Sequence, residues 1–176
     1  MLSIILLSYQ SEKRIEKVFD ALSRKMLEEK IEFECIIMDD ASSDESHNVA
    51  IELETKYENV KAFQLSRNFT SHYSIFAGFS KVQGLCGVAL PDDFQVPLDT
   101  VVEMYRIWEK GKKVVIPYRD DRNDPIISKI FSNLYYSLMN KLSEVKFPKG
   151  GADIFLADTE IINIFNKYIH PKNTST

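Results

Sequence analysis

The chain has 176 residues, of which 44% are hydrophobic and 27% are charged, and it carries a formal net charge of −4. These values fit one well-cored domain and exclude a disordered tail. The longest apolar run, from Ile4 to Leu7, is far too short to cross a bilayer, and no signal peptide precedes it. The two cysteines, Cys35 and Cys86, lie in apolar runs, which predicts buried free thiols in a reducing compartment.

Positive and negative charges are unevenly distributed along the chain. Residues 1–60 hold 7 Lys and Arg against 14 Asp and Glu, whereas residues 106–149 hold 10 against 5. A basic second half fits an anionic substrate or an anionic membrane surface. Solvated helices also carry lysines, so charge alone leaves both interpretations open.

Apolar runs alternate with helical patterns along the first two thirds of the chain. Strands are predicted at residues 3–9, 34–38, 60–65, 86–90 and 113–117. Helices are predicted between them: one after an N-cap at Ser11, one carrying Val49 and Leu53, one from Tyr73 to about residue 82, and one over 97–110. The alternation predicts an α/β fold with a mostly parallel sheet flanked by helices.

The last third of the chain has a different pattern. A charged loop at 118–124 precedes a predicted helix whose apolar face runs from Ile126 to Leu142. A loop rich in Gly and Pro follows, and then a short strand-like segment at 153–156. Asp158 is predicted to cap a final helix that carries Ile162 and Phe165.

Polar or acidic residues follow three of the predicted strands. The segment 8–12 follows the first, Asp39 and Asp40 follow the second, and Asp92 and Asp93 follow the fourth. Because the ends of parallel strands lie along one edge of a sheet, we expect these groups to meet in one cleft. Their carboxylates would accept hydrogen bonds from a nucleotide. The plainer alternative is that Asp39 serves only its own turn and that Asp44 is a helix cap.

The segment 88–97 has the composition of a cation site. Asp92, Asp93 and Gln95 offer hard oxygen ligands within four residues, which suit Mg²⁺ or Mn²⁺. Such an ion usually brings a phosphate group with it. The alternative is a solvated, Asp-rich turn.

Several of these segments, in this order, resemble the signatures of glycosyltransferase family 2. The similarity is closest to the polyprenyl-phosphate branch, which includes dolichol-phosphate mannosyltransferase-like enzymes. The matching segments are Ser-Tyr-Gln-Ser-Glu at 8–12, Asp-Asp-Ala-Ser-Ser-Asp at 39–44, Leu-Ser-Arg-Asn-Phe at 65–69, Asp-Phe-Gln-Val-Pro at 93–97, Tyr-Arg at 118–119 and Gly-Gly-Ala-Asp at 150–153.

The resemblance implies a nucleotide-sugar-binding domain of the GT-A type. It implies that Asp93 and Gln95 hold Mg²⁺ or Mn²⁺ on the diphosphate, with Arg119 near the phosphates and Asp153 near the acceptor. The residues that it places at the nucleotide are Ser8, Tyr9, Glu12, Asp39, Asp40, Arg67 and Asp92. The whole chain is then one domain, with a donor half at about 1–118 and an acceptor half at about 119–176.

The chain departs from the family pattern at three positions. Pro91 stands where the family has the first acid of Asp-x-Asp, Leu85 stands where an acid is usual, and Phe155 replaces an arginine. Family members also continue past this point into amphipathic and often transmembrane helices. The resemblance therefore predicts a catalytic domain that ends early, or a membrane-free relative.

The resemblance implies inverting, metal-dependent transfer of a sugar from a UDP- or GDP-sugar to a polyprenyl phosphate. A lipid phosphate is already anionic, so Asp153 would orient it rather than remove a proton. Transfer to a saccharide hydroxyl is the first alternative, with Asp153 as the base. A binding module impaired by Pro91, Leu85 and Phe155 is the second. The expected location is the cytoplasm, at the inner face of a membrane in the full-length protein, with no nucleic-acid partner.

Overall fold

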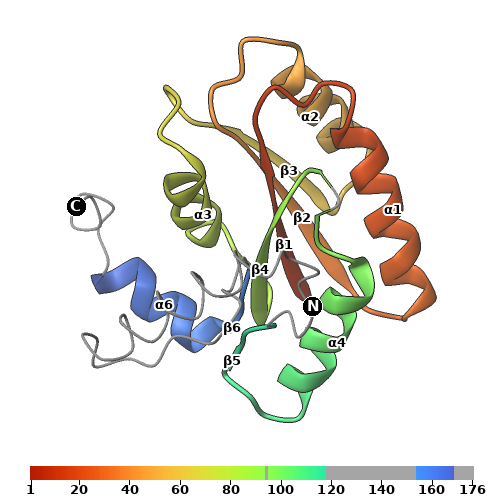
Figure 1. The fold of residues 1–176 in the computed structure, drawn as a ribbon, viewed down its shortest axis with the longest axis vertical. Helices are drawn as coiled ribbons and strands as arrows, with labels where there is room; N and C mark the ends of the chain where they lie inside the picture. Colours follow the sequence, from red (N-terminus) through yellow and green to blue (C-terminus); the bar gives the residue numbers. More distant parts are fainter. Residues whose placement is uncertain (94, 118–153, 169–176) are drawn as a thin grey trace, which may run out of the picture. The chain divides into compact units, whose positions relative to one another are not determined.

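A computed structural model describes residues 1–93, 95–117 and 154–168 of the chain (Figure 1). The chain divides into two compact units, one of residues 1–115 with 156–176 and one of residues 116–155. The strands are β1 (Leu2–Ser8), β2 (Phe33–Asp39), β3 (Val60–Gln64), β4 (Cys86–Pro91), β5 (Val114–Val115) and β6 (Leu156–Asp158). The helices are α1 (Ile15–Glu28), α2 (Ser46–Lys56), α3 (Ser71–Phe79), α4 (Leu98–Glu109) and α6 (Thr159–Tyr168).

The six strands form one sheet in the order β3-β2-β1-β4-β6-β5. The first four strands are parallel, and β6 runs antiparallel to both β4 and β5. The predicted α/β fold with a mostly parallel sheet is therefore confirmed. Because β1, β2 and β4 are parallel neighbours, their carboxyl ends share one edge: Ser8 pairs with Asp39, and Leu7 pairs with Pro91.

The core explains why these segments form these elements. Strand β1 is a continuous apolar run, and its Leu2, Ile4, Ile5 and Leu6 are all fully buried, as expected for a strand covered on both faces. Figure 1 shows α1 and α4 on one side of the sheet and α3 and α6 on the other. Helix α1 buries one apolar face, which is formed by Ile15, Val18, Phe19, Leu22 and Met26.

The structure corrects the predicted start of the first helix. Helix α1 begins at Ile15 with Arg14 in the N-cap position, and no side chain caps it. Ser11 is thus not the N-cap. Its hydroxyl donates to the Tyr9 carbonyl at 2.9 Å and accepts from Arg14 at 2.9 Å, because the chain makes an extra turn before the helix.

The last described elements differ from prediction in their bounds. Strand β6 covers Leu156–Asp158, so it starts three residues later and ends two residues later than the predicted 153–156, and β5 has two residues in place of five. The predicted cap is confirmed, because the Asp158 carboxylate accepts a hydrogen bond from the Glu160 N–H at 3.0 Å. The predicted helix over 126–142 lies outside the described residues.

The structure also describes the two cysteines and the lengths of the helices. Cys35 and Cys86 are free and buried, as predicted. Over the residues that the structure describes, none of the helices is long and apolar enough to traverse a bilayer.

Candidate active site

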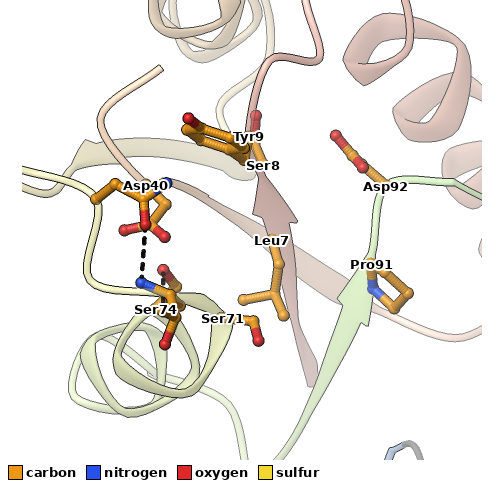
Figure 2. A pocket seen from close by; sticks show the side chains of 10 residues that line it. Leu7, Ser8, Tyr9, Asp40, Ser71, Ser74, Pro91 and Asp92 are labelled. Atoms are coloured by element: carbon orange, nitrogen blue, oxygen red, sulfur yellow. Dashed lines mark hydrogen bonds between the residues drawn. The ribbon is translucent and has the colours of Figure 1, made fainter.

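A cleft of about 400 Å³ opens where β1, β2 and β4 end (Figure 2). The topology creates it, because the three parallel strands deliver their polar end residues to one edge of the sheet. Helix α3 forms one wall and the turn after β4 forms the other. The lining residues are Leu7, Ser8, Tyr9, Asp40, Asn68, Thr70, Ser71, Ser74, Pro91 and Asp92.

Asp40 lies at the floor of this cleft with only 5% of its surface exposed. Its carboxylate accepts a hydrogen bond from the Phe69 N–H at 2.8 Å, and its own N–H donates to the Ser8 carbonyl at 2.9 Å. Asp40 therefore links the end of β2 to β1 and to the loop before α3. Tyr9 lies nearby with 46% of its surface exposed, so its ring is available to a ligand.

Asp39 is fully buried and is not among the residues that line the cleft. It accepts hydrogen bonds from the Ser42 N–H at 3.1 Å and from the Gln64 side chain at 2.8 Å, and the Ser42 hydroxyl also donates to it. These contacts fix the turn after β2 and join it to β3. Asp39 thus holds both its own turn and the neighbouring strand, and its predicted role at the nucleotide stays a prediction.

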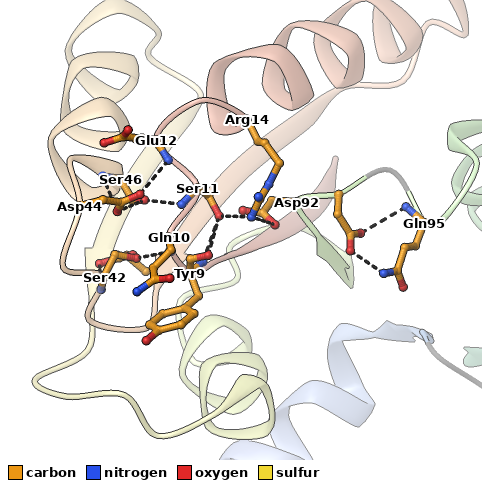
Figure 3. A network of polar contacts seen from close by, with 12 residues as sticks. Tyr9, Gln10, Ser11, Glu12, Arg14, Ser42, Asp44, Ser46, Asp92 and Gln95 are labelled. Atoms are coloured by element: carbon orange, nitrogen blue, oxygen red, sulfur yellow. Dashed lines mark hydrogen bonds and ion pairs between the residues drawn. The ribbon is translucent and has the colours of Figure 1, made fainter.

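Glu12 belongs to a network that ties the loop after β1 to the start of α2 (Figure 3). Its carboxylate accepts from the Glu45 N–H at 3.2 Å, and its own N–H donates to Asp44 at 3.3 Å. Burial tends to raise the pKa of Asp44, but hydrogen bonds from Ser46 and from the Glu12 backbone outweigh it and lower that pKa. Glu12 thus shapes the loop that carries Tyr9 without lining the cleft.

Arg67 lies on the exposed loop between β3 and α3. Its guanidinium sits over the Phe69 ring, 4.6 Å from the ring centroid. Phe69 in turn donates its N–H to Asp40, which lines the cleft, so Arg67 is connected to the cleft through Phe69. Arg67 is outside the cleft lining in this structure.

Asp92 is the buried acid of the turn after β4, with 7% of its surface exposed. One carboxylate oxygen, Oδ1, lies 3.4 Å from the Arg14 guanidinium, and the other, Oδ2, is buried without a hydrogen-bond partner in the described structure. Burial raises the pKa of Asp92, although the Ser11 hydroxyl and Arg14 oppose this rise. Sequence reasoning missed Arg14, since nothing local marks a contact between residues 78 positions apart.

Asp93 and Gln95 are exposed and contact each other. The Gln95 side-chain amide donates to Asp93 Oδ2 at 2.6 Å, and the Gln95 N–H donates to Oδ1 at 3.3 Å. The turn therefore joins the Asp93 carboxylate to the Gln95 amide through the amide nitrogen. Carboxylate and amide oxygens are ligands of the kind that Mg²⁺ and Mn²⁺ prefer. Among the described parts of the chain, no three carboxylate, imidazole or thiol groups gather as a ready cation site.

Two predicted site residues lie in a part of the chain that the structure leaves undescribed. Arg119 and Asp153 both fall within residues 118–153. Their predicted roles near the phosphates and the acceptor stay predictions. Phe155 is described, and Pro91 and Leu85 are at the end of β4 and just before it.

The sequence pattern of glycosyl transferase family 2 matches residues 3–163. The chain belongs to glycosyltransferase family 2. CsbB of Bacillus subtilis, named as a glycosyltransferase, is 28% identical over 167 residues, which are 95% of this chain and 51% of CsbB. An undecaprenyl-phosphate 4-deoxy-4-formamido-L-arabinose transferase of Photorhabdus laumondii is 29% identical over 140 residues, 79% of this chain and 43% of the enzyme. The chain thus spans about half the length of these relatives.

Solved structures share the fold of this family 2 domain. The glucosyl-3-phosphoglycerate synthase of Mycobacterium tuberculosis with bound UDP superposes with a TM-score of 0.62 at 18% identity, over 92% of this chain and 57% of the synthase. TarS of S. aureus gives a TM-score of 0.63 at 18% identity, over 99% of this chain and 52% of the TarS chain. The predicted GT-A-like fold is thereby confirmed.

Proposed function

We propose that this family 2 domain transfers a sugar from a nucleoside-diphosphate sugar, with a divalent cation and with inversion at the anomeric carbon. The observation that carries the proposal is the cleft at the ends of β1, β2 and β4, which Asp92 lines, with the Asp93–Gln95 pair directly after Asp92 in the chain. Ligands of open α/β sheets bind at such an edge. The synthase of similar fold was solved with UDP, and a further structure of it contains Mn²⁺, UDP and glucosyl-3-phosphoglycerate.

The cleft residues fit the parts of a nucleotide. The exposed Tyr9 ring offers a stacking surface for a base, and base–aromatic stacking is generally favourable. Asp40, Ser8 and Asp92 offer oxygen atoms to the hydrogen-bond donors of the base and ribose. Asp39, Glu12 and Arg67 support this surface from behind, because their contacts hold the loops that carry Tyr9 and Asp40.

Asp93 and Gln95 are the residues that we expect to hold Mg²⁺ or Mn²⁺. In the structure the Gln95 amide nitrogen contacts the Asp93 carboxylate, so the Gln95 amide would turn its oxygen toward a bound ion, and the diphosphate would supply further oxygen ligands. When bound, such an ion offsets the negative charge that develops on the departing diphosphate. Arg119 would add a fixed positive charge near the same phosphates.

A polyprenyl phosphate is the acceptor that we favour. Several relatives of this chain are named undecaprenyl-phosphate transferases. A lipid phosphate is anionic at neutral pH and needs no strong base, so Asp153 would orient it rather than deprotonate it. Such an acceptor would bring the full-length protein to the cytoplasmic face of a membrane.

Two other functions have specific support. A saccharide hydroxyl as acceptor would need a general base, and Asp153 is then the candidate. A domain that binds the donor without transferring the sugar is supported by Pro91, whose side chain cannot act as a cation ligand. It is also supported by the small number of candidate cation ligands among the described residues, which are Asp93 and Gln95.

Donor binding and transfer can be tested separately on the 176-residue chain. With Mn²⁺, we expect UDP-sugars or GDP-sugars to raise the melting temperature, and EDTA to abolish this rise. Transfer to a short polyprenyl phosphate, measured beside a soluble sugar acceptor, distinguishes the two catalytic alternatives. Binding without hydrolysis or transfer would identify the impaired module, and a chain that binds neither nucleotide would refute the proposed function.

A further inference from the structure

Thr70 has a backbone conformation that only glycine adopts without strain. Its φ is 78° and its ψ is 162°, in a region where the Cβ of any other residue crowds the backbone. Three further non-glycine residues among those described have a positive φ, but their angles of 49° or 56° are close to the ordinary left-handed region. Because β-branched residues tolerate a positive φ least, Thr70 is a strained position of the described backbone.

Two sets of hydrogen bonds impose this conformation on Thr70. Before it, the Phe69 N–H donates to the buried Asp40 carboxylate at 2.8 Å. After it, the Thr70 carbonyl accepts from the N–H groups of Tyr73 and Ser74 in the first turn of α3, at 3.2 and 3.3 Å. The Thr70 side chain is exposed and does not cap the helix, so its own contacts do not offset the strain.

Residues 67–70, which we call the strap, are held to the sheet through Asp40. The Arg67 guanidinium lies 4.6 Å from the centroid of the Phe69 ring, and this ring lies 5.6 Å from the Tyr73 ring. Arg67 is exposed and both rings are only half-buried, so these contacts are weak. Among the described hydrogen bonds, the one between the Phe69 N–H and Asp40 joins the strap to the end of β2, and we call it the latch.

The strap forms part of the cleft wall. Asn68 and Thr70 line the cleft, and Ser71, the first residue of α3, lines it directly after them. The strain of one such residue is comparable to the net contribution of one hydrogen bond to stability. The strain therefore nearly balances the latch, so a strap released from Asp40 lies close in free energy to the latched strap.

We propose that the strap exchanges between the latched state seen here and a released state, that the strain at Thr70 favours release, and that a nucleotide in the cleft selects the latched state. In the released state Thr70 returns to an unstrained conformation and the Phe69 N–H leaves Asp40. The selection by a nucleotide rests on the proposed function, because it assumes that the donor occupies this cleft. Donor binding is then coupled to the ordering of one cleft wall.

Glycine and alanine at position 70 test the strain. Alanine keeps the Cβ that causes the strain and glycine removes it, so we expect Thr70→Gly to melt about 2–6 °C above Thr70→Ala. Thr55 is the matched control, because it is exposed on α2, where the helical backbone disfavours glycine, and Thr55→Gly should melt below Thr55→Ala. A Thr70→Gly variant that likewise melts below Thr70→Ala would show that position 70 is unstrained and would overturn the proposal.

Hydrogen exchange tests the release of the strap without any ligand. The Phe69 amide exchanges when it leaves Asp40, so its rate reports the released state. We expect this amide to exchange faster than that of Ile37, which is buried in β2, and about tenfold more slowly in Thr70→Gly than in Thr70→Ala. Equal rates for Phe69 and Ile37 would show that the strap opens only when the domain unfolds. A Phe69 amide as fast as in an unfolded peptide would show that the latch does not form, and either result would overturn the proposal.

UDP with Mn²⁺ tests the selection of the latched state. If UDP binds only the latched strap, UDP at about a hundred times its Kd should slow the exchange of the Phe69 amide by up to about a hundredfold. Unchanged exchange of Phe69 at a UDP concentration that calorimetry shows to be saturating would overturn the selection and leave the proposed function intact. A chain that binds neither UDP nor GDP would refute the proposed function and the selection together, whereas the two tests without ligand would still decide whether the strap is strained and opens.

Discussion

Consecutive acids at the end of a strand have different surroundings in this domain. After β2, Asp39 is buried in its own turn, whereas Asp40 lines the cleft. After β4, Asp92 is buried against Arg14, whereas Asp93 is exposed and paired with Gln95. In each pair, one acid is held by neighbouring side chains and the other is left to the cleft or to solvent, so neighbouring acids have different surroundings.

Asp93→Ala should remove metal-dependent function without unfolding the domain. Asp93 is exposed and its described side-chain contacts go only to Gln95, so its loss removes an oxygen ligand but little packing. We expect Mn²⁺-dependent hydrolysis of the donor to fall at least tenfold. Asp20→Ala, which removes the same charge from an exposed site on α1, is the control for the overall charge.

Turnover of Asp93→Ala equal to that of the wild type would remove Asp93 from the cation site. Circular dichroism and the melting temperature of both variants show whether the fold is retained. A loss that appears in Asp20→Ala as well would indicate a long-range charge effect.

At the residue scale, sequence reasoning identified the segments but not every role. Asp40, Ser8 and Tyr9 were assigned to the nucleotide because acids and polar residues follow strands, and the structure places all three at the cleft. The pairing of Arg14 with Asp92 depends on two segments 78 residues apart, and no local pattern specifies such a contact.

Helix α3 depends on a glycine for its position against the sheet. A Cβ added at Gly78 would lie 2.3 Å from Ile5 Cγ2, a contact that real structures do not show. Ile5 is fully buried in β1, so it has little room to move. Because Ser71 and Ser74 of the same helix line the cleft, Gly78 helps to set the width of the cleft.

Gly78→Ala is therefore expected to destabilise the domain by about 1–3 kcal/mol, as overpacked cores generally do. Alanine is the better helix former, so helix propensity alone predicts the opposite sign. Urea unfolding measures the change. In an Ile5→Ala background the added methyl group has space, and we expect the same substitution to be nearly neutral there. An unchanged or raised stability of Gly78→Ala with Ile5 present would contradict the close contact.

At the element scale, long apolar runs were predictable and short strands were not. Strands β1, β2 and β4 are buried on both faces, so their sequences are continuous apolar runs. Strand β6 has three residues, and its place is set by pairing with β4 and β5 rather than by its own composition. Its antiparallel direction depends on that tertiary pairing, which the sequence pattern does not contain.

Both thiols of the molecule are buried in the sheet, and this gives a pH dependence to its stability. Burial raises the pKa of Cys35 and of Cys86 to about 12. The unfolded chain loses these protons at an ordinary thiol pKa near 8.5, whereas the folded chain keeps them. The stabilisation is therefore complete below about pH 8.5 and is lost as the pH rises from there toward 12.

We expect the free energy of unfolding, measured with urea, to decline above about pH 8.5. We also expect Ellman's reagent to modify the two thiols at pH 8 only as fast as the chain unfolds. Each thiol should lower the free energy of unfolding by on the order of 1 kcal/mol for every pH unit above about pH 8.5, and replacing both cysteines by alanine should remove that decline. Rapid reaction of either thiol in the native state would show that it is accessible, against the structure.

The pairing of β5 with β6 has a consequence for the whole molecule. Val115 pairs with Leu156, so the chain on either side of residues 116–155 is joined as in a hairpin, with backbones about 5 Å apart. Residues 115 and 156 are therefore neighbours in the sheet, although 40 residues separate them in the chain. Residues 116–155 can therefore change in length without rethreading of the sheet, because both ends of any replacement are held by the same strand pair.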